Sequence, residues 1–500
     1  MSNRRSINLL MLCLAFRLTV SAEAARAGET SSAPLADAAE QRDGEEVMRL
    51  IKQGTDLNAR QADGTTALIW AAYHDDAETV EQLVKAGADV KATNRYGISA
   101  IQTACLYGNS RIVRLLLNSG ADANTKRDGG ETVLMTAART GILDCAQALI
   151  EAGADVNAKE QRGQTALMWA AAEGHVDVVD ALLVTKAEFR KPLSSGFTPL
   201  NFAVRNGHIE VVNRLIQAGV DVNRAMKEAK GGRDKPAPNT SPLMLALENG
   251  HFELAAVLLE AGADPNDDRT GFAPLHAMSW IRKPERGDGE TGAPPPRGSG
   301  KLSSLDMIRV LVKHGADVND PKKTSGGGRL RISTKGTTPF LCAASTADVD
   351  YMKLLLKLGA NPQAINALKQ NALMLSAGID EKPEGDGPAS PEEHYAAVVY
   401  VLGLKINDIN ATDRNGQTVM HGAAYKSLPK VVKLLDDRGA DIKVWTRKSK
   451  QGRTPLSIAQ GFRPGNFKPN FETVKAISQV MLDHGVQPPS PPKRKGNWSN

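Results

Sequence analysis

Apolar and polar residues follow one another along this chain in blocks that recur every 33 residues. Each block opens with a Thr or Ser before a short apolar run. A second run follows in which buried-type residues recur three apart, as in Val80 with Leu83 and Val179 with Leu182. This spacing predicts two short helices per block, the second with one buried stripe. A glycine and a polar, turn-rich segment end each block, so we expect a loop before the next helix pair.

Five columns of residues keep this step through the first half of the chain. Their members are Thr66, Ser99, Thr132, Thr165 and Thr198; Leu68, Ile101, Leu134, Leu167 and Leu200; Ala71, Ala104, Ala137, Ala170 and Ala203; Leu83, Leu116, Leu149, Leu182 and Leu215; and Gly87, Gly120, Gly153 and Gly219. The hydroxyl can cap a helix start, and the small Ala lets the neighbouring repeat approach. The glycine suits a left-handed backbone after a helix, which costs other residues roughly 1 kcal/mol. Lys186 stands in the missing glycine slot, so we expect a strained joint there.

These residues closely resemble the ankyrin repeat, most clearly in Thr198-Pro199-Leu200 and in Ala273-Pro274-Leu275-His276. The resemblance extends from about residue 33 to residue 485 in twelve units. They start near residues 33, 62, 95, 128, 161, 194, 239, 270, 335, 369, 414 and 451. It implies an all-α solenoid of helix-turn-helix units with hairpin-like finger loops. The family's His recurs only as His276 and His421, so we expect apolar packing to replace its hydrogen bond elsewhere.

Four parts of the chain follow from this pattern. Residues 1–24 are a signal peptide, 33–238 regular repeats, 239–485 less regular repeats with insertions, and 486–500 a disordered Pro-rich and basic tail. The insertions are rich in Gly, Pro and charge, which predicts loops exposed to solvent. They span Ala225 to Asn239, Pro284 to Lys301, Glu381 to Glu393 and Arg463 to Asn470, and Pro321 to Lys335 lengthens a finger.

The first 24 residues have the three parts of a secretory signal. Arg4 and Arg5 precede an apolar run from Ile7 to Phe16, and Ala22-Glu23-Ala24 offers a cleavage site; a buried N-terminal helix is the alternative. We expect an exported protein, periplasmic or secreted. The segment Thr165-Ala166-Leu167-Met168-Trp169 is similar to bacterial ankyrin sequences, which indicates a bacterial source.

Charge and composition narrow the function classes. Cleavage after residue 24 removes three Arg and one Glu, which lowers the formal net charge from +6 to +4. The remaining charges are interspersed and form no basic stripe of the kind that binds phosphates. We therefore expect no nucleic-acid partner. No later stretch approaches the ~20 apolar residues of a membrane span, so we expect no membrane insertion of the mature chain.

Little in the sequence points to catalysis. Gly287 to Gly292 matches the dinucleotide fingerprint, but Arg286 precedes it and three prolines follow, whereas the motif needs a strand before it and a helix after it. No phosphate loop, zinc motif or nucleophile elbow occurs. We therefore expect no enzyme activity, no catalytic residue, and neither a cofactor nor a metal.

Histidines and cysteines have structural explanations. His175, His208 and His251 each follow a glycine at the turn between paired helices, where a structural role is expected. His74 with Asp75 and Asp76 occupies the equivalent turn, and cation binding there is the alternative. Three cysteines remain in the mature chain, which we expect to be free, with a Cys105–Cys145 bridge left open; the third is Cys342.

The candidate site is a surface of the first helices. In ankyrin-like arrays these inner helices line the face where partners dock, and Trp, Tyr and Arg are enriched at binding hot spots. The candidate partner-binding residues are Trp70, Tyr73, Tyr107, Arg139, Trp169, Glu173, Phe202, Arg205 and Asn206. The alternative places Trp70 and Trp169 in the core between units.

The resemblance thus implies a monomeric, non-catalytic scaffold that binds another protein through inner helices and loop tips. Two other functions stay open. One is a secreted host-directed or toxin-associated effector or immunity protein, and the other is an enzyme with its site in an insertion.

Overall fold

A computed structural model describes residues 32–226, 239–284, 300–323, 334–379, 389–462 and 468–490. Every regular element in these ranges is a helix. The β-pairing in the same ranges consists of two isolated bridges, Thr93 with Ser99 and Lys126 with Thr132. The signal peptide, the dinucleotide-like motif and most of each insertion lie outside the described residues.

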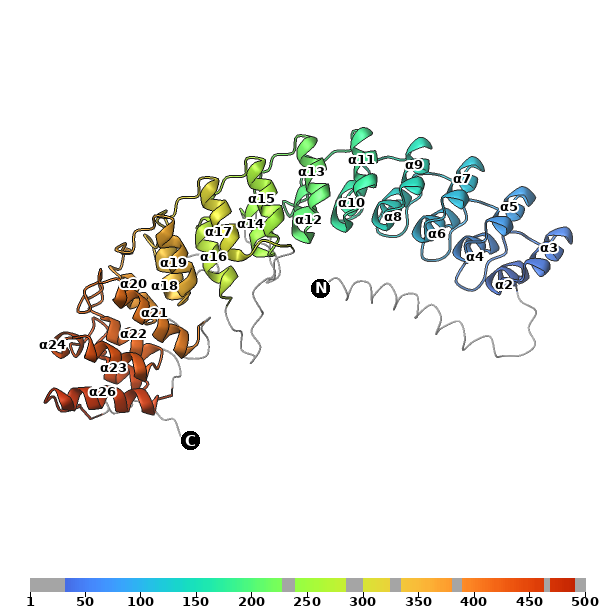
Figure 1. Ribbon diagram of the computed structural model, residues 1–500. Coiled ribbons are helices and arrows are strands. Elements are labelled where there is room, and N and C mark those ends of the chain that lie inside the picture. The colour runs from blue at the N-terminus through green and yellow to red at the C-terminus, as the bar shows by residue number, and fades with distance from the viewer. Residues whose placement is uncertain are drawn as a thin grey trace. The chain divides into compact units, whose positions relative to one another are not determined.

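The helices come in twelve successive pairs along the described chain, as the repeat pattern predicts (Figure 1). The inner helices are α2 (Pro34–Glu40), α4 (Ala67–Tyr73), α6 (Ala100–Tyr107), α8 (Val133–Thr140), α10 (Ala166–Glu173), α12 (Pro199–Asn206), α14 (Pro242–Glu248), α16 (Pro274–Arg282), α18 (Pro339–Ser345), α20 (Ala372–Ser376), α22 (Val419–Tyr425) and α25 (Pro455–Ala459).

The second member of each pair is an outer helix. These are α3 (Gly44–Lys52), α5 (Ala77–Ala86), α7 (Ser110–Asn118), α9 (Leu143–Glu151), α11 (Val176–Val184), α13 (Ile209–Gln217), α15 (Phe252–Glu260), α17 (Ser304–Lys313), α19 (Val349–Lys357), α21 (Pro391–Gly403), α23 (Pro429–Asp437) and α26 (Phe471–Asp483). A short extra helix, α24 (Ile442–Trp445), lies between α23 and α25.

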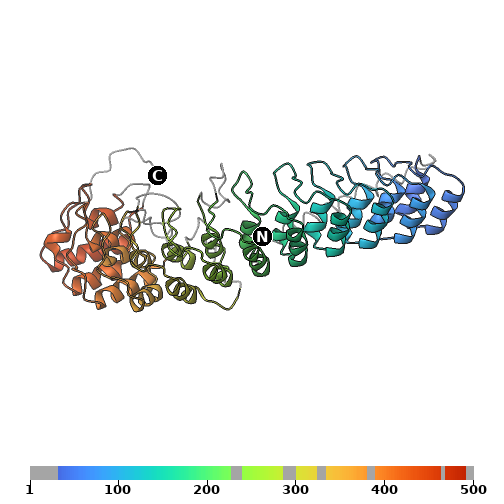
Figure 2. The ribbon, with the colours of Figure 1, turned by 90° about the horizontal axis from the view of Figure 1, so that it is seen from above.

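The chain divides into two compact units. The first comprises Met1–Trp169 with Val184–Ala187, and the second comprises Ala170–Leu183 with Glu188–Asn500. In the first unit α2, α4, α6 and α8 pack in succession as an inner layer, while α3, α5, α7 and α9 form the outer layer. The second unit repeats this arrangement, with α12, α14, α16 and α18 in its inner layer. Figure 2 shows the loops of the first unit projecting together from one side of its helices.

The core is thin and runs between neighbouring repeats. The alanine column is inaccessible to solvent, with Ala104, Ala137 and Ala170 at 0% exposure, and the leucines of the second helices, such as Leu83 and Leu116, are buried to the same extent. Each methylene that these contacts remove from water contributes about 0.8 kcal/mol. Because each pair buries its apolar side only against its neighbours, no repeat holds a complete core alone.

Most of the predicted helix caps form, although Thr66 makes no side-chain cap at the start of α4. The side chains of Ser99, Thr132 and Thr198 accept hydrogen bonds from the backbone amides three residues on. Some outer helices use Asp or Asn instead, as Asp76 and Asn109 do for α5 and α7. A side-chain cap of this kind contributes about 1 kcal/mol to helix stability.

The helix-tying hydrogen bond is more widespread than the scarcity of histidine predicts. His276 Nδ1 accepts from the Ala273 amide at 3.3 Å, and its Nε2 donates to the Thr337 carbonyl at 3.0 Å. Asn201 makes the first of these bonds at the same repeat position, since its Oδ1 accepts from the Thr198 amide at 3.0 Å. Ser457 does so through Oγ at 2.9 Å. The expectation that this bond is mostly absent where histidine is missing therefore has exceptions at Asn201 and Ser457.

One predicted loop is shorter than the sequence suggested. Composition assigned Glu381 to Glu393 to a single insertion, but Pro391 begins α21 and Glu393 lies in its first turn. Ser390 caps this helix, and its amide donates to the Glu393 carboxylate at 2.8 Å. The Ser-Pro-Glu-Glu segment is thus a helix start that its charge and proline content concealed.

The joint at Lys186 has the expected backbone strain. Lys186 has φ of 61°, in the left-handed region that Gly153 and Gly219 occupy at the equivalent positions with φ of 84° and 83°. A side chain in this region crowds the following carbonyl, which glycine avoids.

Replacing Lys186 with Gly should therefore stabilise the chain by about 0.5–1 kcal/mol, because glycine adopts this conformation without steric cost. Urea unfolding of the mature protein would measure the gain, and hydrogen exchange of the amides around residue 186 would locate it. Lys186→Ala is the matched control, since it shortens the side chain and keeps the Cβ. Equal stabilisation by both variants would contradict the backbone explanation.

Two buried histidines make stability depend on pH. Burial lowers the pKa of His276 to about 4 and that of His421 to about 4. An unfolded chain binds a proton on each as pH falls below about 6.5, while the folded chain stays neutral at these sites, so acid favours unfolding.

We expect each of these histidines to remove about 3 kcal/mol of stability between pH 7 and pH 4. His276→Asn and His421→Asn should flatten that loss, because Asn201 shows that asparagine keeps the bond to the helix start without titrating. Urea unfolding at several pH values measures the slope, with His314→Asn after α17 as the control. A slope unchanged in both core variants would refute this origin.

Candidate functional site

In each of the two units, the candidate residues fall into three columns at the ends of the inner helices. The first contains Trp70, Trp169 and Phe202, the second Tyr73, Arg139 and Arg205, and the third His74, Tyr107, Glu173 and Asn206. Because they lie in the last turns of successive inner helices, their side chains project from equivalent places in successive repeats.

Exposure separates these residues into three groups. Tyr107 is 46% exposed, and Glu173, Arg205 and Asn206 are exposed as well. Tyr73, Arg139, Trp169 and Phe202 are partly buried. Trp70 is only 6% exposed. The exposed and partly buried side chains can contact a partner. Trp70 instead lies in the core between repeats, as the alternative interpretation of this residue predicts.

Trp70 supports the surface from beneath. Its Nε1 donates to Gln61 Oε1 at 2.7 Å, and its ring meets Tyr73 edge-on, with the two ring centroids 5.4 Å apart. The His74 ring stacks on the Trp70 ring, with the two ring centroids 5.7 Å apart. A buried indole with a satisfied N–H holds its neighbours in one arrangement.

A tyrosine pair lies at the ends of two neighbouring inner helices of the first unit, α4 and α6. The rings of Tyr73 and Tyr107 lie 5.2 Å apart at 84° to each other. This edge-to-face contact orders two large side chains whose hydroxyl groups can face water. Both residues were chosen from the sequence, and the structure brings them together.

Arg139 is held by both a carboxylate and a ring. Its guanidinium lies 5.7 Å from the centroid of the Trp169 ring, and its Nη2 is 3.3 Å from the Glu131 carboxylate. Glu131 also pairs with Arg127. The Arg139 side chain keeps 23% of its surface exposed, so a fixed cation faces outward beside an aromatic ring.

The second unit contains the remaining candidate residues. Phe202 packs against Phe197 with centroids 5.2 Å apart. Asn206 donates through Nδ2 to the Ala172 carbonyl at 2.6 Å, which ties one inner helix to the end of the preceding one. Arg205 and Glu173 are exposed near these helix ends.

The finger loops are connected by an asparagine ladder that sequence reasoning missed. Asn124, Asn223, Asn266, Asn319 and Asn410 each accept from a backbone amide of the next finger and donate to a carbonyl beside it. The recurring Asn in segments such as Ala-Asp-Val-Asn was a signal that could have predicted it. Each of these five rungs ties one finger to the next.

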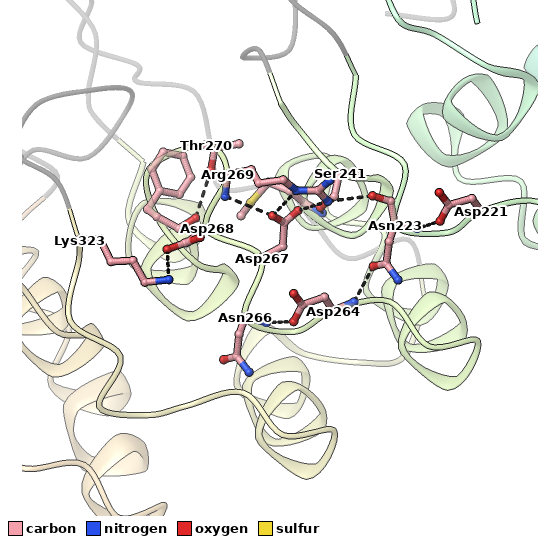
Figure 3. Close-up of polar contacts among 12 residues, drawn as sticks. Asp221, Asn223, Ser241, Asp264, Asn266, Asp267, Asp268, Arg269, Thr270 and Lys323 are labelled. Atoms are coloured by element: carbon pink, nitrogen blue, oxygen red, sulfur yellow. Dashed lines mark hydrogen bonds and ion pairs between the residues drawn. The ribbon is translucent and has the colours of Figure 1, made fainter. Parts of the chain in front are cut away.

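Figure 3 shows how one finger combines this ladder with ion pairs. The Asp264 amide donates to Asn223 Oδ1 at 2.8 Å, and Arg269 Nε lies 2.7 Å from the Asp267 carboxylate. Burial opposes ionisation of Asp267, but hydrogen bonds from Arg269 outweigh it and lower the pKa of that carboxyl. Lys323 pairs with Asp268 at 2.6 Å.

The turn histidines bond to the preceding repeat. Nε2 of His74, His208 and His251 lies 2.8, 3.0 and 3.2 Å from the carbonyls of Glu40, Ala172 and Arg205. His74 also accepts from Arg42 Nε at 2.9 Å through Nδ1. Both ring nitrogens of His74 are thus engaged, and no group of three His, Cys, Asp or Glu side chains suited to a metal occurs in the described ranges.

The cysteines are free thiols in buried positions. Cys105, Cys145 and Cys342 form no disulfide, as the simpler expectation had it. Cys105 and Cys145 lie close enough to share a hydrogen bond, which together with burial raises the pKa of the Cys105 thiol. Burial raises the pKa of Cys342 to about 12. Thiols with a raised pKa, such as those of Cys105 and Cys342, are poor nucleophiles.

Among the helices that the structure describes, none is both long enough and apolar enough to cross a membrane.

Models of one repeat family match much of this chain. A family model of three ankyrin repeats matches residues 11–94, 35–127, 76–160 and 134–226, and a model of the single ankyrin repeat matches residues 239–269 and 335–367. Together these matches cover more than half of the chain. Among solved structures, the human ASB11 ankyrin repeat domain has 24% sequence identity and a TM-score of 0.41, over 47% of this chain and 99% of that one. The chain belongs to the ankyrin repeat family.

Proposed function

We propose that this chain is a non-catalytic scaffold that binds another protein through the ends of its inner helices and its finger tips. Ankyrin repeats are generally protein-interaction modules, which supports a binding role. The observation that carries the proposal is the tyrosine pair, exposed Tyr107 against partly buried Tyr73, together with the held Arg139 in the column of Tyr73. Tyr, Trp and Arg are the residue types that contribute most at protein interfaces.

The mechanism is rigid display. Binding costs about 0.5–1.5 kcal/mol for each flexible side chain that must be ordered. Here neighbouring repeats already hold the side chains, Tyr107 against Tyr73 and Arg139 between Glu131 and Trp169. Several repeats can therefore add contacts to one interface at a small cost in side-chain entropy. The scaffold in this proposal is a monomer.

Export to the periplasm or exterior of a bacterium completes the proposal. It rests on the signal pattern in residues 1–24 and on the similarity of residues 165–169 to bacterial repeats. Mass spectrometry of the protein from its native host should then show Ala25 as the mature N-terminus, since cleavage follows Ala24. A cytoplasmic protein that retains its first residues would overturn export.

An enzyme with its site in an insertion is the opposing function class, and a host-directed effector or immunity protein is a variant of the binding class. Removing Pro284 to Lys301 separates the first from the scaffold, because a docking surface on the inner helices should survive the deletion. Export beyond the outer membrane would favour the effector variant over retention in the periplasm.

The docking surface is tested with exposed residues alone. The variant Tyr107→Ala, Glu173→Ala, Arg205→Ala should lose at least about tenfold in affinity for proteins captured by the mature chain, since each ~1.4 kcal/mol of contact is tenfold. Surface plasmon resonance with each captured protein measures the loss. The control variant changes outer-helix residues of similar type, Glu78→Ala, Arg111→Ala and Glu210→Ala. Equal affinity for the inner-helix and control variants would move the docking site elsewhere.

A further inference from the structure

Two carboxylates converge at the start of the inner-helix layer. Asp37 and Glu40 of α2 both accept hydrogen bonds from the one Nε2 of Gln61, at 2.7 Å each. Gln61 is fixed in turn, because its Oε1 accepts from the buried Trp70 Nε1. Two like charges are therefore held near each other by a neutral amide, a geometry that repulsion disfavours and a nearby cation relieves.

The surroundings add negative charge. Neither Asp37 nor Glu40 has an ion-pair partner in the described part of the chain, and both are partly exposed. Asp75 and Asp76 follow α4 at the neighbouring turn. Arg42 is the adjacent cation, and its Nε donates to His74. Burial lowers the pKa of His74, which therefore adds no positive charge at neutral pH. Asp75 and Asp76 are already engaged, since Asp75 accepts a hydrogen bond from Asn109 Nδ2 and Asp76 caps α5, so Asp37 and Glu40 are the carboxylates left for a partner.

This acidic edge adjoins the tyrosine pair. His74 bonds the Glu40 carbonyl, and its ring lies 5.0 Å from the ring of Tyr73. Tyr73 meets Tyr107, which is 46% exposed. Carboxylates beside aromatic rings suit a side chain with an apolar stem and a cationic end, since the stem packs on the rings and the charge pairs with the carboxylates.

We propose that the inner-helix face formed by α2, α4 and α6 docks a basic segment of the partner protein. A Lys or Arg of that segment packs along Tyr73 and Tyr107 and pairs with Asp37 and Glu40. The inference rests on the proposed function and specifies the chemistry of the partner. The same charges repel phosphate-bearing partners, and two carboxylates that share an amide donor offer too few ligands for a divalent cation.

The test uses a phage-displayed library of random twelve-residue peptides, selected on the mature chain at low salt. Selected peptides should carry Lys or Arg next to an apolar residue. Their affinity should fall about tenfold or more for Asp37→Asn, Glu40→Gln, because these changes keep acceptors for Gln61 while removing both charges. It should also fall with added salt, as charge pairing requires.

Three controls separate the outcomes. Glu78→Gln, an exposed acid of outer helix α5, should leave affinity unchanged, and circular dichroism should show the double variant folded. Peptides that depend on Tyr107 and are indifferent to Asp37→Asn, Glu40→Gln would overturn this inference and leave the inner-helix scaffold intact. Peptides indifferent to Tyr107→Ala and to the acidic variant alike would count against both.

Discussion

Burial of apolar side chains between successive helix pairs is the interaction on which the rest of this molecule depends. Ala104 and Leu116 are shielded by residues of adjacent repeats, and no repeat has a centre of its own. The free energy of the fold is therefore spread along the chain as a series of neighbour contacts. The small alanine column sets how closely the inner helices approach, and so sets the spacing of the side chains that a partner meets.

Much of this organisation could be predicted from the sequence, because repetition turns weak signals into strong ones. One Thr before an apolar run says little, but five in register identified the capped helix starts at Ser99, Thr132 and Thr198. Where the register broke, prediction weakened. The segment from Pro391 to Glu393 was assigned to a loop because its charge and proline outweighed the capping pattern of Ser390.

The candidate site could be predicted less completely, for a physical reason. A column of residues gives position on a helix, but exposure depends on the loop that covers it. Trp70 and Trp169 share a column, yet Gln61 of the preceding finger covers the indole of Trp70, while Trp169 stays partly exposed beneath Arg139. The convergence of Asp37 and Glu40 on Gln61 spans more than twenty residues of sequence and follows from packing alone.

The asparagine ladder allows insertions between the repeats without a change in how neighbouring fingers are bonded. Its bonds join residues 29 apart from Asn124 to Gly153, 39 apart from Asn223 to Gly262, and 49 apart from Asn266 to Gly315, with the same donor and acceptor each time. The rung length is thus independent of how much chain has been inserted between the fingers. New sequence can accumulate in the insertions while the pitch between neighbouring fingers stays constant, so the chain can evolve additional surfaces without retuning those already in use.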